Sequence, residues 1–220
     1  AKWVFDLKDN DTFWSLVDLN WGTHAAFDIF GPWSNGTSVV IFSGRFDPEK
    51  CFRVVENYRV SVWSLTPALF RQLTIHCSKL ENRYDLSSLR HLVSSGDFLP
   101  PDAVHGSIET LGLPLHDLWS QTEAGGILVA NFPGLPIRPG SMGKPLPGII
   151  AAVVDDHGRE LPFGQIGHLA FKPGWSSQMR KVWRRPHKFR SYFKTGWTLD
   201  KIRTKWYISG DIAYRNKDGY

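Results

Sequence analysis

The segment from Asp117 to Gly126, which ends in two glycines, carries the side chains best suited to chemistry. The apolar residues at its start indicate a strand, and parallel α/β sheets bind ligands beyond the carboxyl ends of strands. The Thr122 hydroxyl could donate to a phosphate, and the Glu123 carboxylate suits Mg²⁺, which takes carboxylate and phosphate oxygens together. The plainer alternative is a helix N-cap, in which a threonine precedes an acidic residue.

Two other stretches could contact a nucleotide. Ser94–Pro100 follows a predicted strand, and Gly96 would let the backbone approach a flat ligand closely. Asp211 follows a glycine on another predicted strand, where its carboxylate could accept two hydrogen bonds from a ribose diol. The plainer alternatives are an ordinary strand-to-helix loop for the first stretch and a surface carboxylate beside a hairpin for the second.

The first 132 residues alternate strand and helix signals. Short apolar runs predict strands near 38–42, 60–64, 89–93 and 115–119, and an apolar-rich segment predicts a helix over 23–33. Further helices are predicted to begin near Asp47, Thr66 and Pro100, where proline or a capping residue stands. This alternation predicts an α/β fold, a parallel sheet flanked by helices.

The sequence changes character at Pro133, after which glycine and proline are frequent. Strands are predicted over 149–154, 166–171 and 206–208, with one inserted helix over 177–192. We therefore expect an α/β subdomain at 1–132, followed at 133–220 by a small, mostly antiparallel, β-barrel-like subdomain.

Composition limits the class of protein. Two cysteines without metal-ligand spacing favour a reducing, cytoplasmic location. No apolar stretch is long enough to span a membrane, and we expect no membrane partner. The net charge of +5 permits polyanionic ligands without requiring nucleic acid, which is not expected. The basic run over 180–190 suits a solvated helix face, with CoA phosphates or nucleic acid as the alternative.

Taken in order, these motifs resemble the adenylate-forming superfamily, and most of all its acetyl-CoA synthetase and medium-chain acyl-CoA synthetase branch. The resemblance covers essentially the whole chain. Other segments that resemble this branch in order and spacing are 9–14 through Trp21, 31–33, 45–48, 139–145, 161–162 and 175–193.

The resemblance implies an AMP-forming carboxylate–CoA ligase that takes a carboxylic acid, ATP and CoA, with Mg²⁺. It implies that Thr122 contacts the α-phosphate and that Glu123 binds the metal, and these two are the implied catalytic residues. The implied nucleotide-binding residues are Gly96, Asp97, Phe98, Asp117, Leu118, Trp119, Gln121, Thr122 and Asp211. The implied acyl-pocket residues are Trp21, Gly22, Thr23, Ser95 and Ser120.

The chain departs from this family pattern in two ways. The phosphate-gripping loop with its lysine and the mobile C-terminal domain are absent, so we expect a segment of a longer protein that is inactive alone. Small residues at 22, 95 and 120 also predict an acid larger than acetate, since the acetate enzymes tend to carry bulkier residues there. Adenylation for a carrier protein and a non-catalytic module that binds nucleotides or nucleic acid stay open as alternatives.

Overall fold

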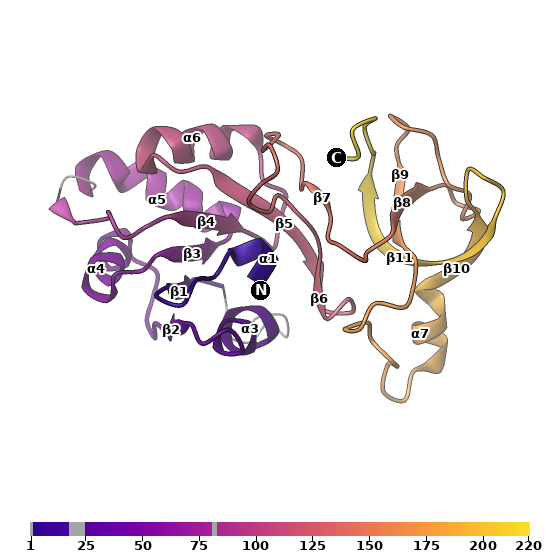
Figure 1. The fold of residues 1–220 in the computed structure, drawn as a ribbon, viewed down its shortest axis with the longest axis horizontal. Helices are drawn as coiled ribbons and strands as arrows, with labels where there is room; N and C mark the ends of the chain where they lie inside the picture. Colours follow the sequence, from indigo (N-terminus) through magenta and orange to yellow (C-terminus); the bar gives the residue numbers. More distant parts are fainter. Residues whose placement is uncertain (1, 18–24, 81–82) are drawn as a thin grey trace. The chain divides into compact units, whose positions relative to one another are not determined.

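The computed structural model describes residues 2–17, 25–80 and 83–220. Its internal contacts divide the chain into two units (Figure 1). The α/β unit contains Ala1–Ser120 and Val129–Gly143, and the β unit contains Gln121–Leu128 and Lys144–Tyr220. The expected subdomain boundary at residue 132 stays a prediction.

A mixed, largely parallel sheet of seven strands has the order β2-β1-β3-β4-β5-β6-β7. The strands are β1 (Thr12–Ser15), β2 (Ser38–Val40), β3 (Val62–Leu65), β4 (His91–Ser94), β5 (Leu115–Gln121), β6 (Gly126–Ala130) and β7 (Lys144–Pro145). The pairs from β2 to β5 are all parallel. The predicted α/β class with a parallel sheet is therefore confirmed. Since parallel strands end at the same edge, the loops after β3, β4 and β5 lie side by side.

Three helices, α4 (Pro48–Tyr58), α5 (Pro67–Leu80) and α6 (Pro101–Leu111), begin where proline predicted them. Proline suits the first helical turn because its missing N–H has no intrahelical partner there. Asp47 caps α4 by accepting a hydrogen bond from the Lys50 amide at 3.1 Å.

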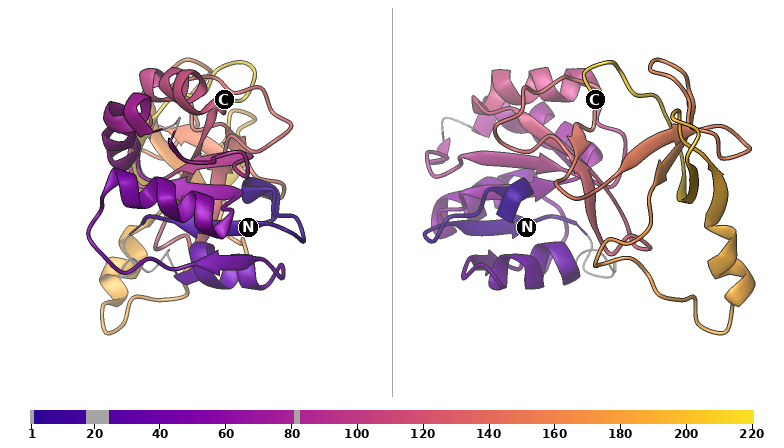
Figure 2. Two further views of the ribbon diagram at one scale, coloured as in Figure 1. Left: turned by 90° about the vertical axis from the view of Figure 1, so that its left-hand side faces the viewer. Right: turned by 45° about the vertical axis from the view of Figure 1, so that its right-hand side comes forward.

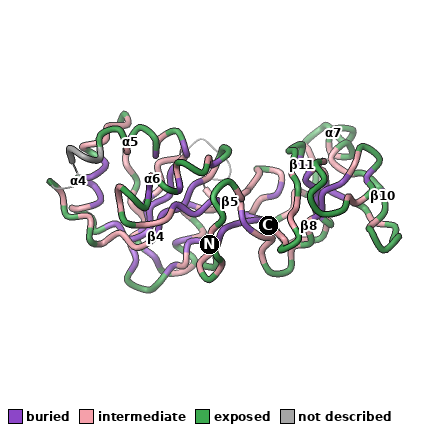
Figure 3. Tube along the Cα trace, turned by 90° about the horizontal axis from the view of Figure 1, so that it is seen from above, coloured by how far each residue is buried: buried purple, intermediate pink, exposed green. Residues whose placement is uncertain are grey.

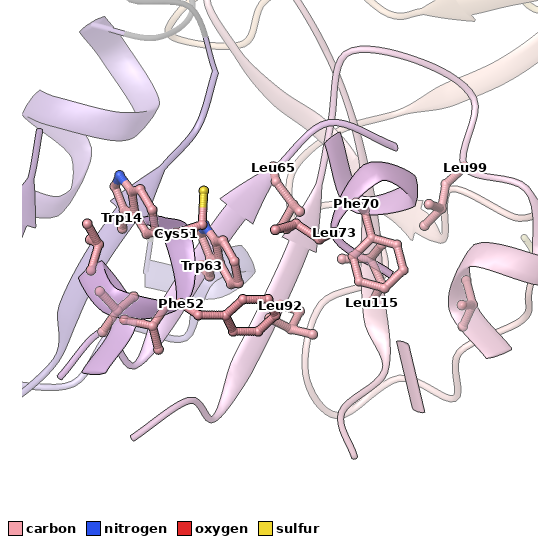
Figure 4. Close-up of a cluster of buried hydrophobic side chains, with 14 residues drawn as sticks. Trp14, Cys51, Phe52, Trp63, Leu65, Phe70, Leu73, Leu92, Leu99 and Leu115 are labelled. Atoms are coloured by element: carbon pink, nitrogen blue, oxygen red, sulfur yellow. The ribbon is translucent and has the colours of Figure 1, made fainter. Parts of the chain in front are cut away.

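These helices pack on one face of the sheet through a buried cluster (Figure 4). Trp14 and Trp63 stack within this cluster, with ring centroids 5.3 Å apart and planes within 4°. The strands contribute Trp14, Trp63, Leu65, Leu92 and Leu115, and the helices contribute Phe52, Phe70 and Leu73 among others. In Figure 3, β4 runs through buried residues, whereas the labelled helices α4, α5 and α6 carry exposed turns. This core fixes the strand ends that carry the predicted site.

The opposite face of the sheet meets the N-terminal helix α1 (Lys2–Phe5). The Phe5 and Phe13 rings lie 5.0 Å apart, and the Arg90 guanidinium binds both Asp6 and Asp11. His91 on β4 donates from Nε2 to the Val4 carbonyl at 2.9 Å. Its ring also lies 4.4 Å from that of His116 on β5. Two imidazoles are thus buried together beneath α1.

The β unit contains an antiparallel sheet with the order β10-β11-β9-β8 (Figure 1). Figure 2 shows its orange and yellow strands from two further directions. Its strands are β8 (Ala151–Val154), β9 (Gly167–Phe171), β10 (Phe193–Trp197) and β11 (Arg203–Ala213). The segment 159–161 connects the two edge strands. The Glu160 amide donates to Trp197 at 2.8 Å, and the Leu161 amide donates to Val153 at 2.8 Å. These bonds give the small sheet its barrel-like closure.

Several predicted elements differ in the structure. The helix expected over 177–192 is shorter: α7 runs from Pro186 to Ser191. Proline disfavours helical backbone in the residue before it, which prevents an earlier start. The described part of the predicted 23–33 helix is a π-helix, Ala25–Phe30, that continues directly into α3, Gly31–Trp33. Strands β1, β6, β7 and β10 and helix α1 were not predicted. Among the described residues, no helix is long and apolar enough to cross a membrane.

The buried imidazole pair predicts acid sensitivity. Burial, with a smaller contribution from His116, lowers the pKa of His91 from 6.5 to about 4. The unfolded chain therefore binds a proton between about pH 6.5 and 4 that the folded chain excludes, so stability falls as pH falls through that window. We expect the free energy of unfolding to drop by about 2 kcal/mol from this group between pH 7.5 and 5.

Urea unfolding followed by tryptophan fluorescence at the two pH values measures this drop. His91→Gln should lose most of it, whereas the exposed His105→Gln variant on α6 should keep it. An equal drop in the wild type and in His91→Gln would show that other groups cause the acid sensitivity.

Candidate active site

The loop after β4 and the carboxyl-terminal part of β5 bring the first set of predicted residues to neighbouring strand ends. Ser94 on β4 lies opposite Asp117 on β5 in the parallel register. After β4, Gly96 has a φ of 95°, a backbone conformation that favours glycine. Phe98 leaves 66% of its surface exposed, so its ring is available to a flat ligand.

The β5 end combines a buried acid with partly exposed side chains. Asp117 is 7% exposed, and burial raises the pKa of its carboxyl to about 8, although the Leu118 amide opposes the shift. Leu118 is buried, whereas Trp119 and Ser120 are half-buried. A largely protonated Asp117 at neutral pH would present a neutral hydrogen-bonding group to a ligand.

A cleft of about 500 Å³ opens near the carboxyl ends of β1 and β2. None of the predicted site residues that the structure describes lines this cleft. Its lining is mostly apolar and includes Leu16, Val17, Ile29, Val40, Phe42, Phe46 and Leu69.

The turn from Gln121 to Gly126 belongs to the β unit, where β11 anchors its first residue. The Gln121 side chain donates from Nε2 to the Ser209 carbonyl at 2.9 Å. Its Oε1 accepts a hydrogen bond from the Tyr207 hydroxyl. The Asp211 amide in turn donates to Ser209 Oγ at 3.0 Å. These bonds connect the chain segments that carry Thr122 and Asp211.

A second segment, 175–179, anchors the end of the same turn. The Ala124 carbonyl accepts from Trp175 Nε1 at 2.8 Å and from Ser177 Oγ at 2.9 Å. The Met179 amide donates to the Glu123 carbonyl at 3.0 Å. The backbone of the turn is therefore held on both sides of Glu123.

One tyrosine hydroxyl binds the Glu123 carboxylate, and the ring of a second tyrosine stacks on the first. The Tyr192 hydroxyl donates to Glu123 Oε1 at 2.8 Å, and its ring stacks on Tyr207 at 5.8 Å. Burial first and the bond to Glu123 second raise the pKa of Tyr192. Burial also raises the pKa of Tyr207. Both phenols stay protonated at neutral pH, so Tyr192 remains a donor and Glu123 its acceptor.

The structure groups the predicted residues into two sets. Residues 95–98 and 117–120 lie at neighbouring strand ends in the α/β unit, and Gln121, Thr122, Glu123 and Asp211 belong to the β unit. That both sets contact one ligand stays a prediction. Trp21, Gly22 and Thr23 lie outside the described residues.

The basic run over 180–190 is exposed. Lys181 Nζ and the Arg184 guanidinium lie 5.4 and 5.7 Å from the centroid of the exposed Trp183 ring. Only its last part is helical, in α7, where Lys188 lies over the Tyr192 ring at 4.9 Å.

Sequence reasoning missed the residues that hold the turn, which are Trp175, Ser177, Met179, Tyr192, Tyr207 and Ser209. They lie 51 to 88 residues from their partners in the turn, so no local spacing links them. The only available signal was the concentration of aromatic residues between 175 and 207.

Comparison with protein families shows the family to which the chain belongs. The model of the family described as AMP-binding enzyme matches residues 1–178, which is most of the chain. The chain belongs to this AMP-binding enzyme family. The resemblance that the ordered motifs suggested is confirmed.

Two curated relatives define the branch. The chain is 43% identical over 220 residues to acetyl-coenzyme A synthetase of Bacillus subtilis (strain 168). The alignment covers 100% of this chain and 37% of that protein. It is 40% identical to acetyl-coenzyme A synthetase of Pasteurella multocida (strain Pm70), in an alignment that covers 99% of this chain and 34% of that protein. The chain thus spans about a third of the length of these relatives.

Solved structures share the fold. An acyl-CoA synthetase of Brucella canis superposes with a TM-score of 0.84 at 27% identity, over 99% of this chain and 38% of that one. The anthranilate CoA ligase AuaEII in complex with anthranoyl-AMP gives the same TM-score and identity, over 99% of this chain and 39% of that one. The AMP-binding fold therefore extends across both units of this chain.

The anchored turn predicts that Gly125 tolerates no side chain. Its φ is 63°, and a Cβ atom there would lie 2.2 Å from the Ser177 carbonyl oxygen, well inside contact distance. Gly112 has a similar φ of 68° with nothing within 4 Å of its Cβ position. We expect Gly112→Ala to cost about 1–2 kcal/mol from the left-handed backbone alone. Gly125→Ala should cost clearly more and should loosen the turn.

The free energy of unfolding of both variants and their nucleotide affinity check this. Equal losses of stability would mean that Ser177 moves away freely and does not anchor the turn.

Proposed function

We propose that the full-length protein is an AMP-forming carboxylate–CoA ligase that acts on an acid larger than acetate. The acid carboxylate attacks the α-phosphorus of ATP, and pyrophosphate leaves to give an acyl-adenylate. The CoA sulfur then attacks the acyl carbonyl carbon, its thiol proton is released, and AMP leaves. We place this activity in the cytoplasm.

The observation that carries the proposal is the anchored turn from Gln121 to Gly126. It holds an exposed Thr122 and the Glu123 carboxylate on a backbone fixed from both sides. Preorganised groups of this kind stabilise developing charge without reorganising during the reaction. Family membership adds independent support.

The chain's other residues supply binding and orientation. Gly96 and Phe98, with the β5 end at Asp117 and Trp119, would enclose the adenine, where an exposed ring and a neutral carboxyl suit a flat, uncharged base. Asp211 would accept hydrogen bonds from the ribose hydroxyls. Thr122 would donate to the α-phosphate.

Glu123 would hold Mg²⁺. Among the described residues no cluster of three or more histidine, cysteine or acidic side chains could bind a metal alone. A single carboxylate nevertheless fits Mg²⁺, which commonly binds through one or two carboxylates, substrate phosphates and water. When bound, the ion would offset the negative charge on the phosphates.

Small side chains and an apolar cleft support the larger acid. Ser95 and Ser120 lie at the neighbouring ends of β4 and β5, where they add little bulk. The cleft of about 500 Å³ near the ends of β1 and β2 adds apolar volume at the same edge of the sheet. Each buried CH₂ of an acid that fits contributes about 0.8 kcal/mol.

ATP–pyrophosphate exchange tests the proposal. The full-length protein should exchange label between ATP and pyrophosphate in the presence of its acid, and the 220-residue chain alone should stay at background. The reason is that a phosphate clamp, which usually combines backbone N–H groups with a lysine, is not evident in this chain. Glu123→Gln in the full-length protein should lower exchange strongly.

Exchange by the isolated chain would show that the missing loop is dispensable. If the full-length protein shows no exchange with any acid tested, the proposed activity is wrong. Measuring thioester formation with CoA beside acyl loading of a carrier protein identifies which of the two accepts the acyl group.

Acid selectivity gives a second test. In the full-length protein, kcat/KM should rise from acetate to acids with several more carbons. Ser120→Trp should reverse this order, because over-packing a filled pocket costs roughly 1–3 kcal/mol. Its affinity for ATP should stay close to that of the wild type.

A series of straight-chain acids measured for both proteins decides this prediction. A wild type that prefers acetate, or a Ser120→Trp variant that still takes long acids equally well, would place the pocket wall at other residues.

A further inference from the structure

The hydrogen bond from Tyr192 to Glu123 has no role in the proposed reaction steps. It directly follows α7, in a segment whose family-like motifs assign it no role. Its hydroxyl lies 2.8 Å from Glu123 Oε1, although 69 residues separate the two in sequence. Its ring is fixed by stacking on Tyr207, with planes within 8°, and Lys188 Nζ lies 4.9 Å from its centroid.

The Glu123 backbone is already fixed without Tyr192. The Met179 amide binds its carbonyl, and Trp175 and Ser177 bind the carbonyl of the next residue. Without Tyr192, the three side-chain torsions of Glu123 would stay free to rotate, and ordering such a side chain costs free energy. Since Tyr192 holds the end of this side chain, its bond removes that freedom.

We propose that Tyr192 is a positioning residue that presents the second oxygen of Glu123, Oε2, to the metal. This inference rests on the proposed function, in which Glu123 binds Mg²⁺. Because the Tyr192 hydroxyl binds Oε1, the carboxylate is oriented so that Oε2 would be the oxygen that holds the metal. Tyr192 acts through Glu123 and is not itself a catalytic residue.

A phenol suits this task better than a cation would. A lysine or arginine beside Glu123 would neutralise the carboxylate and compete with Mg²⁺ for its charge. The neutral hydroxyl orients the carboxylate while leaving its full negative charge. The stacked Tyr207 supports the ring of Tyr192, and the Tyr207 hydroxyl binds Gln121 of the same turn. Two stacked tyrosines therefore hold the first and third residues of the Gln-Thr-Glu sequence.

Tyr192→Phe in the full-length protein tests the inference, because it keeps the stacked ring and removes only the hydroxyl. The probe is α,β-methylene ATP, whose reacting bond cannot be cleaved, measured by calorimetry with Mg²⁺ and again in EDTA. We expect the affinity with Mg²⁺ to fall about ten-fold, the lower end of what one hydrogen bond to a charged group contributes, and the affinity in EDTA to stay unchanged. The Mg²⁺ concentration that half-saturates pyrophosphate exchange should rise, with the KM for the acid unchanged.

Two further variants make the result specific. Tyr58→Phe, at an exposed site on α4, should match the wild type in every measurement. In a Glu123→Gln background, adding Tyr192→Phe should cause no further loss of Mg²⁺-dependent binding, since both changes act on one interaction.

The outcomes separate the two proposals. A wild-type protein that gains no affinity from Mg²⁺ would remove the metal from the proposed function. If the wild type gains affinity and Tyr192→Phe gains as much, the positioning role is wrong. Equal weakening of the variant with Mg²⁺ and in EDTA would mean that Tyr192 only stabilises the β unit, a conclusion that its melting temperature would support by falling.

Discussion

The hydrogen bonds that anchor the turn from Gln121 to Gly126 are the constraint on which the predicted chemistry depends. A turn that carries a threonine and a glutamate for ligand binding must leave their side chains available, so other groups must fix its backbone. Gln121 provides this on one side through β11, and Ala124 provides it on the other through Trp175 and Ser177. The segment 175–179 therefore supports the predicted site, although it carries none of the predicted ligand-binding residues.

This anchoring also explains the two glycines that end the turn. At Gly125 and Gly126, Cβ atoms would lie 2.2 Å from the Ser177 carbonyl oxygen and 2.6 Å from its hydroxyl oxygen. The close approach that permits Ser177 to bind Ala124 thus excludes a side chain at both positions. The glycines serve packing within the protein, and not only the approach of a ligand.

The sequence allowed the α/β architecture and the strand-end positions of the site to be predicted, because both depend on local patterns. Apolar runs such as 38–42 and proline-led helix starts such as Pro48 report directly on nearby backbone. Strand β10 was missed because its central residues, Lys194, Thr195 and Gly196, lack an apolar pattern, and its pairing with β11 supplies its stability. The anchors Tyr192 and Ser209 were missed for a related reason, since only the tertiary fold brings them to the turn.

Charge is divided unequally between the two predicted halves of the site. The α/β unit offers an exposed ring at Phe98, the exposed Asp97 and a buried Asp117 whose pKa is raised to about 8, so one of its two acids is largely neutral at pH 7. The β unit offers the carboxylates of Glu123 and Asp211. A nucleotide has the same division, with a flat, uncharged base and a sugar-phosphate part that binds metal and hydrogen-bond partners. In the proposed complex, an ionised Asp117 would place a desolvated charge beside the uncharged base, which could not pair with it. Its burial among the strand ends would therefore favour the proposed nucleotide site by keeping one acid neutral beside the base, while the Glu123 carboxylate would be the group left to bind the proposed metal.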